Sequence, residues 1–453
     1  MSVPATNDLL LRLASRPAAA RWLRRLGLPA PVALQRRAGG WQGDELAGRR
    51  LAMAALGESP ALLQLSAGLQ GLGAQLQEHA QGPLDGIVID ARPLAQPAEL
   101  GSLRELFAAW LPQLAPRARI VVLGPDPVPG EPVSRHATAQ ALGGLVRSLG
   151  KEIGRRGAGI NLLSLPPGDS PALASSVAFL LSPRSGFISG QRLRLAGGAS
   201  DRPVAGWCPG ALAGQTAVVT GAARGIGQAT ARRLAEEGAR VLCVDMPAQL
   251  AELQALADSL HGQALALDVR DENAGNVLAA AVRALGGADI VVHNAGITRD
   301  RTLARMSPAD WEAVLAVNLE AVMALDAALD DAAAWQPGAR TICLSSINGL
   351  AGAAGQTHYA AAKAGLVGYV QARAALLAPH GAAINAVAPG FIETAMTARL
   401  PRAVALAGRR LSSLSQGGQP RDVAEAITFL ALPHQAAING QVLRVCGQSF
   451  VGA

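Results

Sequence analysis

The chain has 453 residues, of which 50% are hydrophobic and 16% are charged, and its formal net charge at pH 7 is +7. This length suits about two or three domains of roughly 150 residues each. No apolar run reaches the roughly 18 residues that a membrane span requires. The first residues, Met1 to Asp8, lack the basic start of a secretory signal. We therefore expect a cytoplasmic protein with no membrane association.

The positive charge does not by itself indicate nucleic-acid binding. The arginines are spread over both halves of the chain and only 3% of the residues are aromatic, whereas single-stranded nucleic acids are bound by aromatic stacking. An acidic or phosphorylated substrate carrier suits this charge better. The cysteines stand far apart without C-x-x-C spacing, so neither a disulfide framework nor a metal site is expected. We interpret them as small core residues: Cys208, Cys243, Cys343 and Cys446.

Two parts of the chain repeat one another. Residues 179–194 align without a gap with residues 429–444, and residues 156–161 align with residues 380–385. A self-similarity on this scale indicates an internal repeat of domain size. A cluster of Pro and Gly at residues 207–210 marks the linker. The repeat therefore predicts two domains, residues 1–205 and residues 206–453.

The second copy reads as an α/β domain with a glycine turn. Residues 216–220 form an apolar run of strand length, and a glycine-rich turn follows before a helical pattern through Leu234. Strand, turn and helix in this order are typical of dinucleotide binding, because the free N–H groups at the start of a helix favour an anion. A turn without a ligand is the alternative. The turn residues are Gly221, Ala222, Ala223, Arg224, Gly225, Ile226 and Gly227.

Two side chains bear on the choice of dinucleotide. Asp245 ends the next apolar run, at about the distance of ~20 residues where an acidic residue meets the adenosine ribose. A carboxylate there accepts a hydrogen bond from the 2′-hydroxyl and repels a 2′-phosphate, which favours NAD over NADP. Arg224, within the turn, could instead pair with that phosphate. We weight Asp245 more heavily, although a strand-end turn former is its alternative role.

Further runs of strand length follow at α/β spacing: residues 264–268, 290–294, 341–345 and 383–387. Helical periodicity follows each run, so we expect a parallel, doubly wound sheet with its site at the carboxyl ends of the strands. Several polar or turn residues fall at that edge: Asp268, Asn294, Ser346, Pro389 and Gly390.

Tyr359 and Lys363 stand four residues apart in a helical segment, which places them on one face. An ammonium group beside a phenol favours the phenolate, so we expect Lys363 to lower the pKa of Tyr359 and to make it a general acid or base. Surface packing is the ordinary role of such a pair. The repeat places Arg135 opposite Tyr359 and Ala139 opposite Lys363, so the first copy is expected to lack catalytic residues.

These features together resemble the short-chain dehydrogenase/reductase family. The resemblance rests on the glycine turn, on Asn294-Ala295-Gly296, on Ser346 and on Tyr359-x-x-x-Lys363, and it covers nearly all of residues 211–453. Motifs at residues 293–300, 317–319, 389–394 and 417–424 are similar to 3-oxoacyl-thioester reductases of fatty-acid metabolism. The double length resembles their high-molecular-weight branch, which has an inactive, flavodoxin-like N-terminal domain and uses NADH.

The resemblance implies a role for each matching residue. Tyr359 would protonate the ketone oxygen, Ser346 would donate a hydrogen bond to it, Lys363 would hold the nicotinamide ribose, and Asn318 would hold a water that resupplies protons. Asp268 and Val269 would contact adenine. Asn294 and Gly296 would contact the adenosine-side ribose and backbone, and Ile392 and Thr394 the carboxamide and phosphates. His293 departs from the family pattern, where another Asn is usual.

Three functions fit the sequence. The leading hypothesis is NADH-dependent reduction of 3-oxoacyl thioesters of coenzyme A or acyl carrier protein, by a homodimer or higher oligomer, with NADPH less favoured. The second is a short-chain dehydrogenase for a free alcohol, sugar or steroid, and the third is a non-catalytic dinucleotide-binding protein. The family places its substrate-covering helices at residues 394–419, which combine leucines with arginines. An apolar slot with an arginine rim would suit an acyl chain on the anionic phosphopantetheine of coenzyme A or acyl carrier protein. An ordinary amphipathic helix is the alternative.

Overall fold

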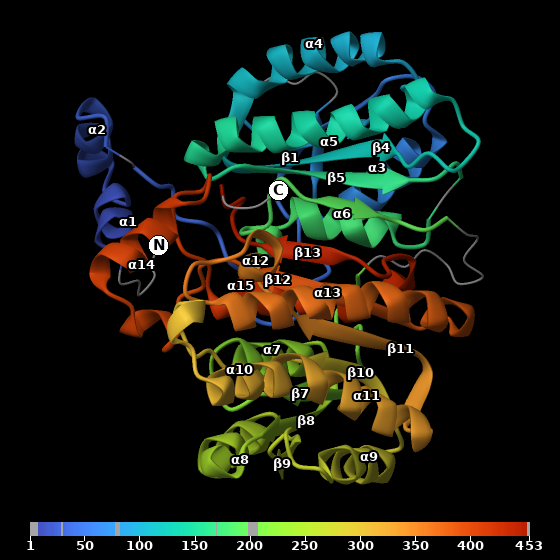
Figure 1. Ribbon diagram of the computed structural model, residues 1–453. Helices are drawn as coiled ribbons and strands as arrows, with labels where there is room; N and C mark the ends of the chain where they lie inside the picture. Colours follow the sequence, from blue (N-terminus) through green and yellow to red (C-terminus); the bar gives the residue numbers. More distant parts are fainter. Residues whose placement is uncertain (1–7, 29, 78–81, 169, 198–206, 451–453) are drawn as a thin grey trace. The chain divides into compact units, whose positions relative to one another are not determined.

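The computed structural model describes residues 8–28, 30–77, 82–168, 170–197 and 207–450, and it divides into two compact units (Figure 1). The N-terminal unit comprises residues 1–208, 397–418 and 446–450. The C-terminal unit comprises residues 209–396, 419–445 and 451–453. The predicted boundary between residues 205 and 206 falls outside the described residues, so it stays a prediction.

The N-terminal unit is built on a six-stranded sheet of order β2-β1-β3-β4-β5-β6, in which every neighbouring pair is parallel. The first five positions have the 2-1-3-4-5 order of flavodoxin-like sheets, which confirms the predicted fold class. Its strands are β1 (Arg50–Ala55), β2 (Gln75–Gln77), β3 (Leu84–Asp90), β4 (Leu114–Pro125), β5 (Gly159–Leu165) and β6 (Arg192–Arg194). Its α-helices are α1 (Leu9–Ala14), α2 (Pro17–Arg25), α3 (Pro60–Gly71), α4 (Leu100–Trp110), α5 (Val133–Ile153), α6 (Leu173–Leu181) and α14 (Arg402–Arg410).

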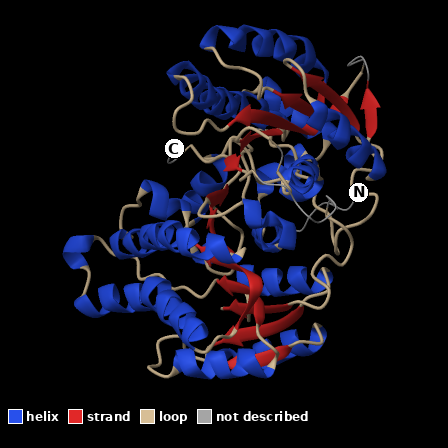
Figure 2. Ribbon diagram, turned by 90° about the vertical axis from the view of Figure 1, so that its right-hand side faces the viewer, coloured by secondary structure: helices blue, strands red, loops and turns tan. Residues whose placement is uncertain are grey.

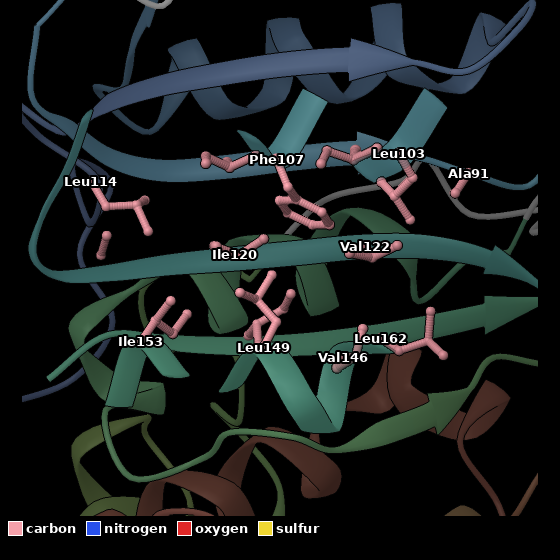
Figure 3. Close-up of a cluster of buried hydrophobic side chains, with 14 of the residues drawn as sticks. Ala91, Leu103, Phe107, Leu114, Ile120, Val122, Val146, Leu149, Ile153 and Leu162 are labelled. Carbon is pink, nitrogen blue, oxygen red and sulfur yellow. The ribbon is translucent and has the colours of Figure 1, made fainter. Parts of the chain in front are cut away.

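The core of this unit lies between the sheet and its covering helices (Figure 3). Ile120 and Val122 of β4 pack there with Phe107 of α4 and with Val146 and Leu149 of α5. Strands that are covered on both faces need continuous apolar runs, and β4 supplies one with the fully buried stretch Ile120–Leu123.

The C-terminal unit carries a seven-stranded parallel sheet of order β13-β12-β11-β10-β7-β8-β9. Counted from β7, this is the 3-2-1-4-5-6 order of dinucleotide-binding sheets with one added strand. In both units the strands lie between helices (Figure 2). The strands are β7 (Thr216–Thr220), β8 (Arg240–Asp245), β9 (Gln263–Ala266), β10 (Ala288–His293), β11 (Trp335–Leu344), β12 (Ala383–Pro389) and β13 (Val442–Val445).

The helices of the C-terminal unit alternate with these strands, as the spacing predicts. They are α7 (Gly225–Glu236), α8 (Leu250–Ser259), α9 (Ala274–Ala284), α10 (Pro308–Leu315), α11 (Ala321–Asp331), α12 (Ile347–Ala351), α13 (Thr357–Leu377) and α15 (Pro420–Ala431). A π-helical turn, Ala316–Glu320, joins α10 to α11. The switch in strand order falls between β7 and β10, and ligands of such sheets bind at the carboxyl ends of the strands there.

The internal repeat is visible in matched hydrogen bonds. The amide of Asn161 donates to the carbonyl of Ile188 (3.2 Å) and accepts from the backbone N–H of Gln191 (3.0 Å). Asn385 does the same with Ile438 (2.7 Å) and Gln441 (3.0 Å). The helix before each strand, α5 or α13, spans 21 residues. The two copies therefore keep the same packing at the end of the sheet.

The chemistry of the second copy is missing from the first. Arg135, opposite Tyr359 in the alignment, forms an ion pair with Glu131 at 3.3 Å, and Ala139, opposite Lys363, is buried. At the end of β3, the carboxylate of Asp90 is held by Arg92 (2.6 Å) and by the hydroxyl of Ser59 (2.5 Å). In the first copy, Arg92 and Ser59 therefore bind the carboxylate at this end of the sheet. The second copy has its glycine turn at the corresponding end.

The cysteine prediction needs one correction. Cys243, Cys343 and Cys446 are buried, but Cys208 is exposed. Cys208 lies in the predicted linker, where the chain leaves the N-terminal unit, so it has no core around it. The linker is nevertheless anchored at its start, because Trp207 stacks on Trp41 with ring centroids 4.5 Å apart.

Candidate active site

The glycine turn joins the end of β7 to the start of α7. Gly221 has a φ of +65°, a conformation that favours glycine. A Cβ on Gly227 would lie 2.0 Å from the carbonyl oxygen of Gly221 and 2.5 Å from the amide nitrogen of Asn294. No larger residue fits at this point. The first turn of α7 therefore packs against the strand end, and its N–H groups lie at a helix start, the kind of position that favours anions in proteins.

Asn294 fixes the turn from the neighbouring strand. Its side-chain amide donates to the carbonyls of Thr220 and Gly221, each at 3.0 Å, and its backbone N–H donates to the Thr220 hydroxyl, also at 3.0 Å. The resemblance implied a contact of Asn294 with the cofactor ribose. The geometry shows a further role, since the amide holds the glycine turn in shape.

Asp245 lies at the end of β8, against the same turn. One carboxylate oxygen accepts from the backbone N–H of Ala223 (2.9 Å), and the other accepts from that of Met246 (2.8 Å). Arg224 occupies the N-cap position of α7 and is exposed. The carboxylate is thus fixed beside the turn, whereas the guanidinium of Arg224 lies on the surface.

The two residues predicted to contact adenine follow β9. Arg270 binds both carboxylate oxygens of Asp268, with the shortest distance at 2.5 Å. The Arg270 hydrogen bond is the main cause that lowers the pKa of Asp268. Val269 packs against the apolar cluster between the sheet and α9. The Asp268 side chain is therefore held in one orientation as an anion.

Tyr359, Lys363 and the two serines come from α13 and from the end of β11. The hydroxyl of Ser345 donates to the backbone carbonyl of Lys363 at 2.7 Å. Ser346 caps α12, accepting from the N–H of Asn348 at 3.1 Å, and its hydroxyl is near enough to the Tyr359 phenol to oppose the rise of the Tyr359 pKa. Ser345 therefore has a structural partner, and Ser346 is the serine beside the phenol.

The expected lowering of the Tyr359 pKa is wrong for this arrangement. Burial raises the pKa of the phenol, the Ser346 hydrogen bond opposes that rise, and Asp300 adds to it. Lys363 is itself buried, and desolvation lowers its pKa to about 8. Its ammonium group lies 5.8 Å from the centre of the Tyr359 ring and donates to the carbonyl of Leu344 at 2.6 Å. Burial of the phenol therefore outweighs the effect that was expected of the neighbouring lysine.

Asn318 lies in the π-helical turn between α10 and α11, a local distortion that often marks a functional position. Its amide nitrogen donates to the carbonyls of Ile297 (2.9 Å) and Val314 (2.8 Å). Its buried side-chain oxygen has no hydrogen-bond partner among the described residues. A Cβ on Gly296 would lie 2.7 Å from this oxygen and 3.5 Å from the Lys363 ammonium. A side chain at position 296 would therefore crowd the Asn318 oxygen and approach the Lys363 ammonium, and glycine avoids this.

The remaining predicted residues follow β12. Pro389 ends that strand, and the N–H of Gly390 donates to the carbonyl of Val445 at 2.9 Å. Ile392 is buried, and the methyl of Thr394 lies 4.0 Å from the Cβ position of Gly225. The loop after β12 therefore reaches the glycine turn, as cofactor binding by both would require.

A buried polar network adjoins the site, and sequence reasoning did not identify most of its members. Asp326 of α11 binds His293 (2.8 Å), the hydroxyl of Tyr369 (2.6 Å) and, more distantly, Arg373 (3.6 Å). Burial alone would raise the pKa of Asp326, but these partners bring it below its usual range. His293, which stands where the family usually has Asn, is thus bound by a buried carboxylate. In the sequence, the one sign of this network is Tyr369, a second tyrosine on the helix of Tyr359.

In the described part of the chain, no group of three or more His, Cys, Asp or Glu side chains could hold a metal ion. Among the same residues, every helix is too short or too polar to cross a membrane.

A family model described as enoyl-(acyl carrier protein) reductase matches residues 221–447. The 3-oxoacyl-(acyl carrier protein) reductase of Vibrio cholerae is 40% identical over 243 residues, which are 53% of this chain and 99% of that protein. The enzyme of the same name from Escherichia coli is 40% identical over 244 residues, 52% of this chain and 98% of its own length. That of Thermotoga maritima is 39% identical over 240 residues, again 52% of this chain and 98% of its own.

Among solved structures, a dehydrogenase/reductase from Sinorhizobium meliloti is 34% identical and covers 53% of this chain and 96% of its own, with a TM-score of 0.49. The family model and the enzymes match the part of the chain that contains the glycine turn, Asn318, Ser346, Tyr359 and Lys363. The chain belongs to the short-chain dehydrogenase/reductase family of nicotinamide-dependent oxidoreductases.

Proposed function

We propose that the protein reduces 3-oxoacyl thioesters to 3-hydroxyacyl thioesters with NADH. The observation that carries the proposal is the joint presence of Ser346, Tyr359, Lys363 and the unpartnered oxygen of Asn318 in a chain 40% identical to 3-oxoacyl-(acyl carrier protein) reductases. The residues fit a dinucleotide, since the glycine turn leaves a helix start free and Gly296 keeps the space beside Lys363 open. The double-length, high-molecular-weight branch of these reductases is the proposed subgroup.

When bound, the reduced nicotinamide supplies the hydride. The protein has to stabilise the negative charge that develops on the ketone oxygen, and donors placed there in advance are the main means of doing so. Ser346 and Tyr359 are those donors. The raised pKa of Tyr359 keeps the phenol protonated, which suits a group that gives a proton during reduction.

Lys363 and Asn318 support this proton transfer. The Lys363 ammonium would bind the nicotinamide ribose, and its charge would stabilise the phenolate once Tyr359 has lost its proton. A water held by the free Asn318 oxygen would return a proton from solvent. Both roles use buried polar atoms near Gly296, namely the Asn318 side-chain oxygen and the Lys363 ammonium.

The preference for NADH is argued from Asp245. Its carboxylate lies against the turn and accepts from Ala223 and Met246, so its charge is fixed where a 2′-phosphate would have to be placed. Arg224, by contrast, is exposed. Repulsion from a fixed carboxylate outweighs attraction to a guanidinium in water, because solvent screens the latter.

Replacing Tyr359 by Phe should reduce turnover of acetoacetyl-CoA by a factor of about 10² to 10⁴, the usual contribution of a general acid. NADH oxidation at 340 nm measures this. Tyr369, the only other tyrosine, gives the matched control, since Tyr369→Phe removes a phenol on the same helix that binds Asp326. Equal rates in the two variants would contradict the role of Tyr359. Failure of the wild-type protein with any thioester would point to a free alcohol, sugar or steroid, or to simple dinucleotide binding.

The change Asp245→Asn removes the charge and keeps an acceptor oxygen for one of the two backbone N–H groups. We expect the ratio of kcat/KM with NADH to kcat/KM with NADPH to fall roughly tenfold, equivalent to about 1.4 kcal/mol. Steady-state rates with each dinucleotide give the ratio, and Asp258→Asn, an exposed carboxylate on α8, is the control. An unchanged ratio, or a wild-type protein that prefers NADPH, would mean that Asp245 does not set the preference.

The lowered pKa of Lys363 predicts a pH limit on activity. A cation with a pKa of about 8 loses its charge as the pH rises through that value, so kcat/KM should decline above about pH 8. Tyr359 does not account for such a decline, because its raised pKa keeps it protonated there. Lys363→Arg, whose charge persists, should be less active but lack this decline. A wild-type profile that stays level to pH 10 would contradict the assignment.

A further inference from the structure

We propose that α1, α2 and α14 of the N-terminal unit form a docking surface for an acidic protein that carries the acyl thioester. We define the arginine surface by the exposed cations of these helices, of the link between α1 and α2 and of the turn before α14: Arg12, Arg16, Arg21, Arg25, Arg399 and Arg402. The inference rests on the proposed function, because it names the form in which the substrate arrives.

The charge of this surface has one sign. Between Asp8 and Asp44 the sequence contains seven arginines and no acidic residue, and residues 397–418, the later segment of the same unit, contain four arginines and no acidic residue. Surfaces of soluble proteins ordinarily mix charges of both signs, and a field of one sign attracts a partner of the other. Two segments far apart in the chain thus bring the same charge to one unit.

A buried ion pair joins the two segments. Arg410, at the end of α14, donates to both carboxylate oxygens of Asp8, at 2.9 and 2.6 Å. Asp8 is 3% exposed and also accepts from the N–H of Leu11 at the start of α1. The one carboxylate at this position is therefore neutralised within the protein. It fixes α14 beside α1 (Figure 1) and contributes no negative charge to the exterior.

Apolar side chains lie among the arginines. Trp22 is 64% exposed and Leu26 53% exposed, next to Arg21 and Arg25, while Val404 of α14 is 51% exposed. Binding energy at protein interfaces is concentrated in Trp, Tyr and Arg. Charged rims set the rate and specificity of association. An acidic protein fits this combination, whereas coenzyme A needs only a small pocket for its phosphates and pantetheine.

The chain connects this surface to the loop after β12, which reaches the glycine turn. Thr397 begins the segment that belongs to the N-terminal unit, two residues after Ala395 and close to Thr394, whose methyl approaches Gly225. The segment ends before Gln419, which caps α15. The segment that contains α14 is inserted between β12 and α15 of the unit with the candidate site. A carrier protein bound to this segment would bring substrate to the enzyme, whereas an anionic lipid surface would bring none. The observations therefore favour a carrier protein over a membrane.

The test compares two forms of one acyl group, acetoacetyl-CoA and the same acyl group on acyl carrier protein. In Arg21→Glu/Arg25→Glu, the KM for the protein-bound substrate should rise roughly tenfold or more, with kcat unchanged and with the KM for acetoacetyl-CoA changed less than about twofold. The control is Arg104→Glu/Arg155→Glu, which reverses two exposed charges elsewhere in the same unit. The control should leave both KM values unchanged.

Three results would overturn the proposal. The KM for acetoacetyl-CoA could rise as much as the KM for the carrier-bound substrate, or the two double variants could change KM equally. Alternatively, Arg21→Glu/Arg25→Glu could lose binding to anionic phospholipid vesicles while its KM for the carrier-bound substrate stays unchanged. If the wild-type protein turns over no thioester, the proposed function fails separately. Direct titration with acyl carrier protein then decides the docking surface. Binding that is lost in Arg21→Glu/Arg25→Glu supports the surface, and no binding to the wild-type protein contradicts it.

Discussion

The close approach of Gly227 to the carbonyl of Gly221 is the constraint on which the candidate site depends. A Cβ at Gly227 would lie 2.0 Å from that oxygen, so only glycine lets α7 start directly over the end of β7. N–H groups at such a helix start favour an anion. Asn294 and Asp245 form hydrogen bonds with the turn from the strands on either side of β7. One packing requirement thereby positions the glycine turn, the Asp245 carboxylate and the strand end that precedes Gly296.

The two copies separate what the fold requires from what the reaction requires. Both keep an Asn whose amide bridges the last loop of the sheet, at positions 161 and 385, because an unpaired amide or backbone group in that buried place would be costly. Only the second copy has a glycine turn, a serine beside a phenol and a buried lysine. In the first copy, Arg92 and Ser59 bind the carboxylate at the strand end, and the edge is filled by the protein's own partners.

Sequence reasoning identified the strands, the glycine turn and the serine, tyrosine and lysine, since these follow from periodicity and fixed spacing. It did not give the direction of the Tyr359 pKa shift, which burial determines and which spacing along a helix does not reveal. It also missed the Asp326 network, whose members come from β10, α11 and α13 and meet only in the folded chain. The same holds for residues 397–418, whose packing partners lie hundreds of positions earlier, as the Asp8 and Arg410 pair shows.

The central claim is that, of the two related units, only the C-terminal one binds a dinucleotide. The stoichiometry of NADH binding, measured by calorimetric titration of the full chain, tests it most directly. We predict one NADH for each chain, and none in Gly227→Val, where the added side chain would meet the Gly221 carbonyl. Two bound NADH molecules for each chain, or one that persists in Gly227→Val, would contradict the account.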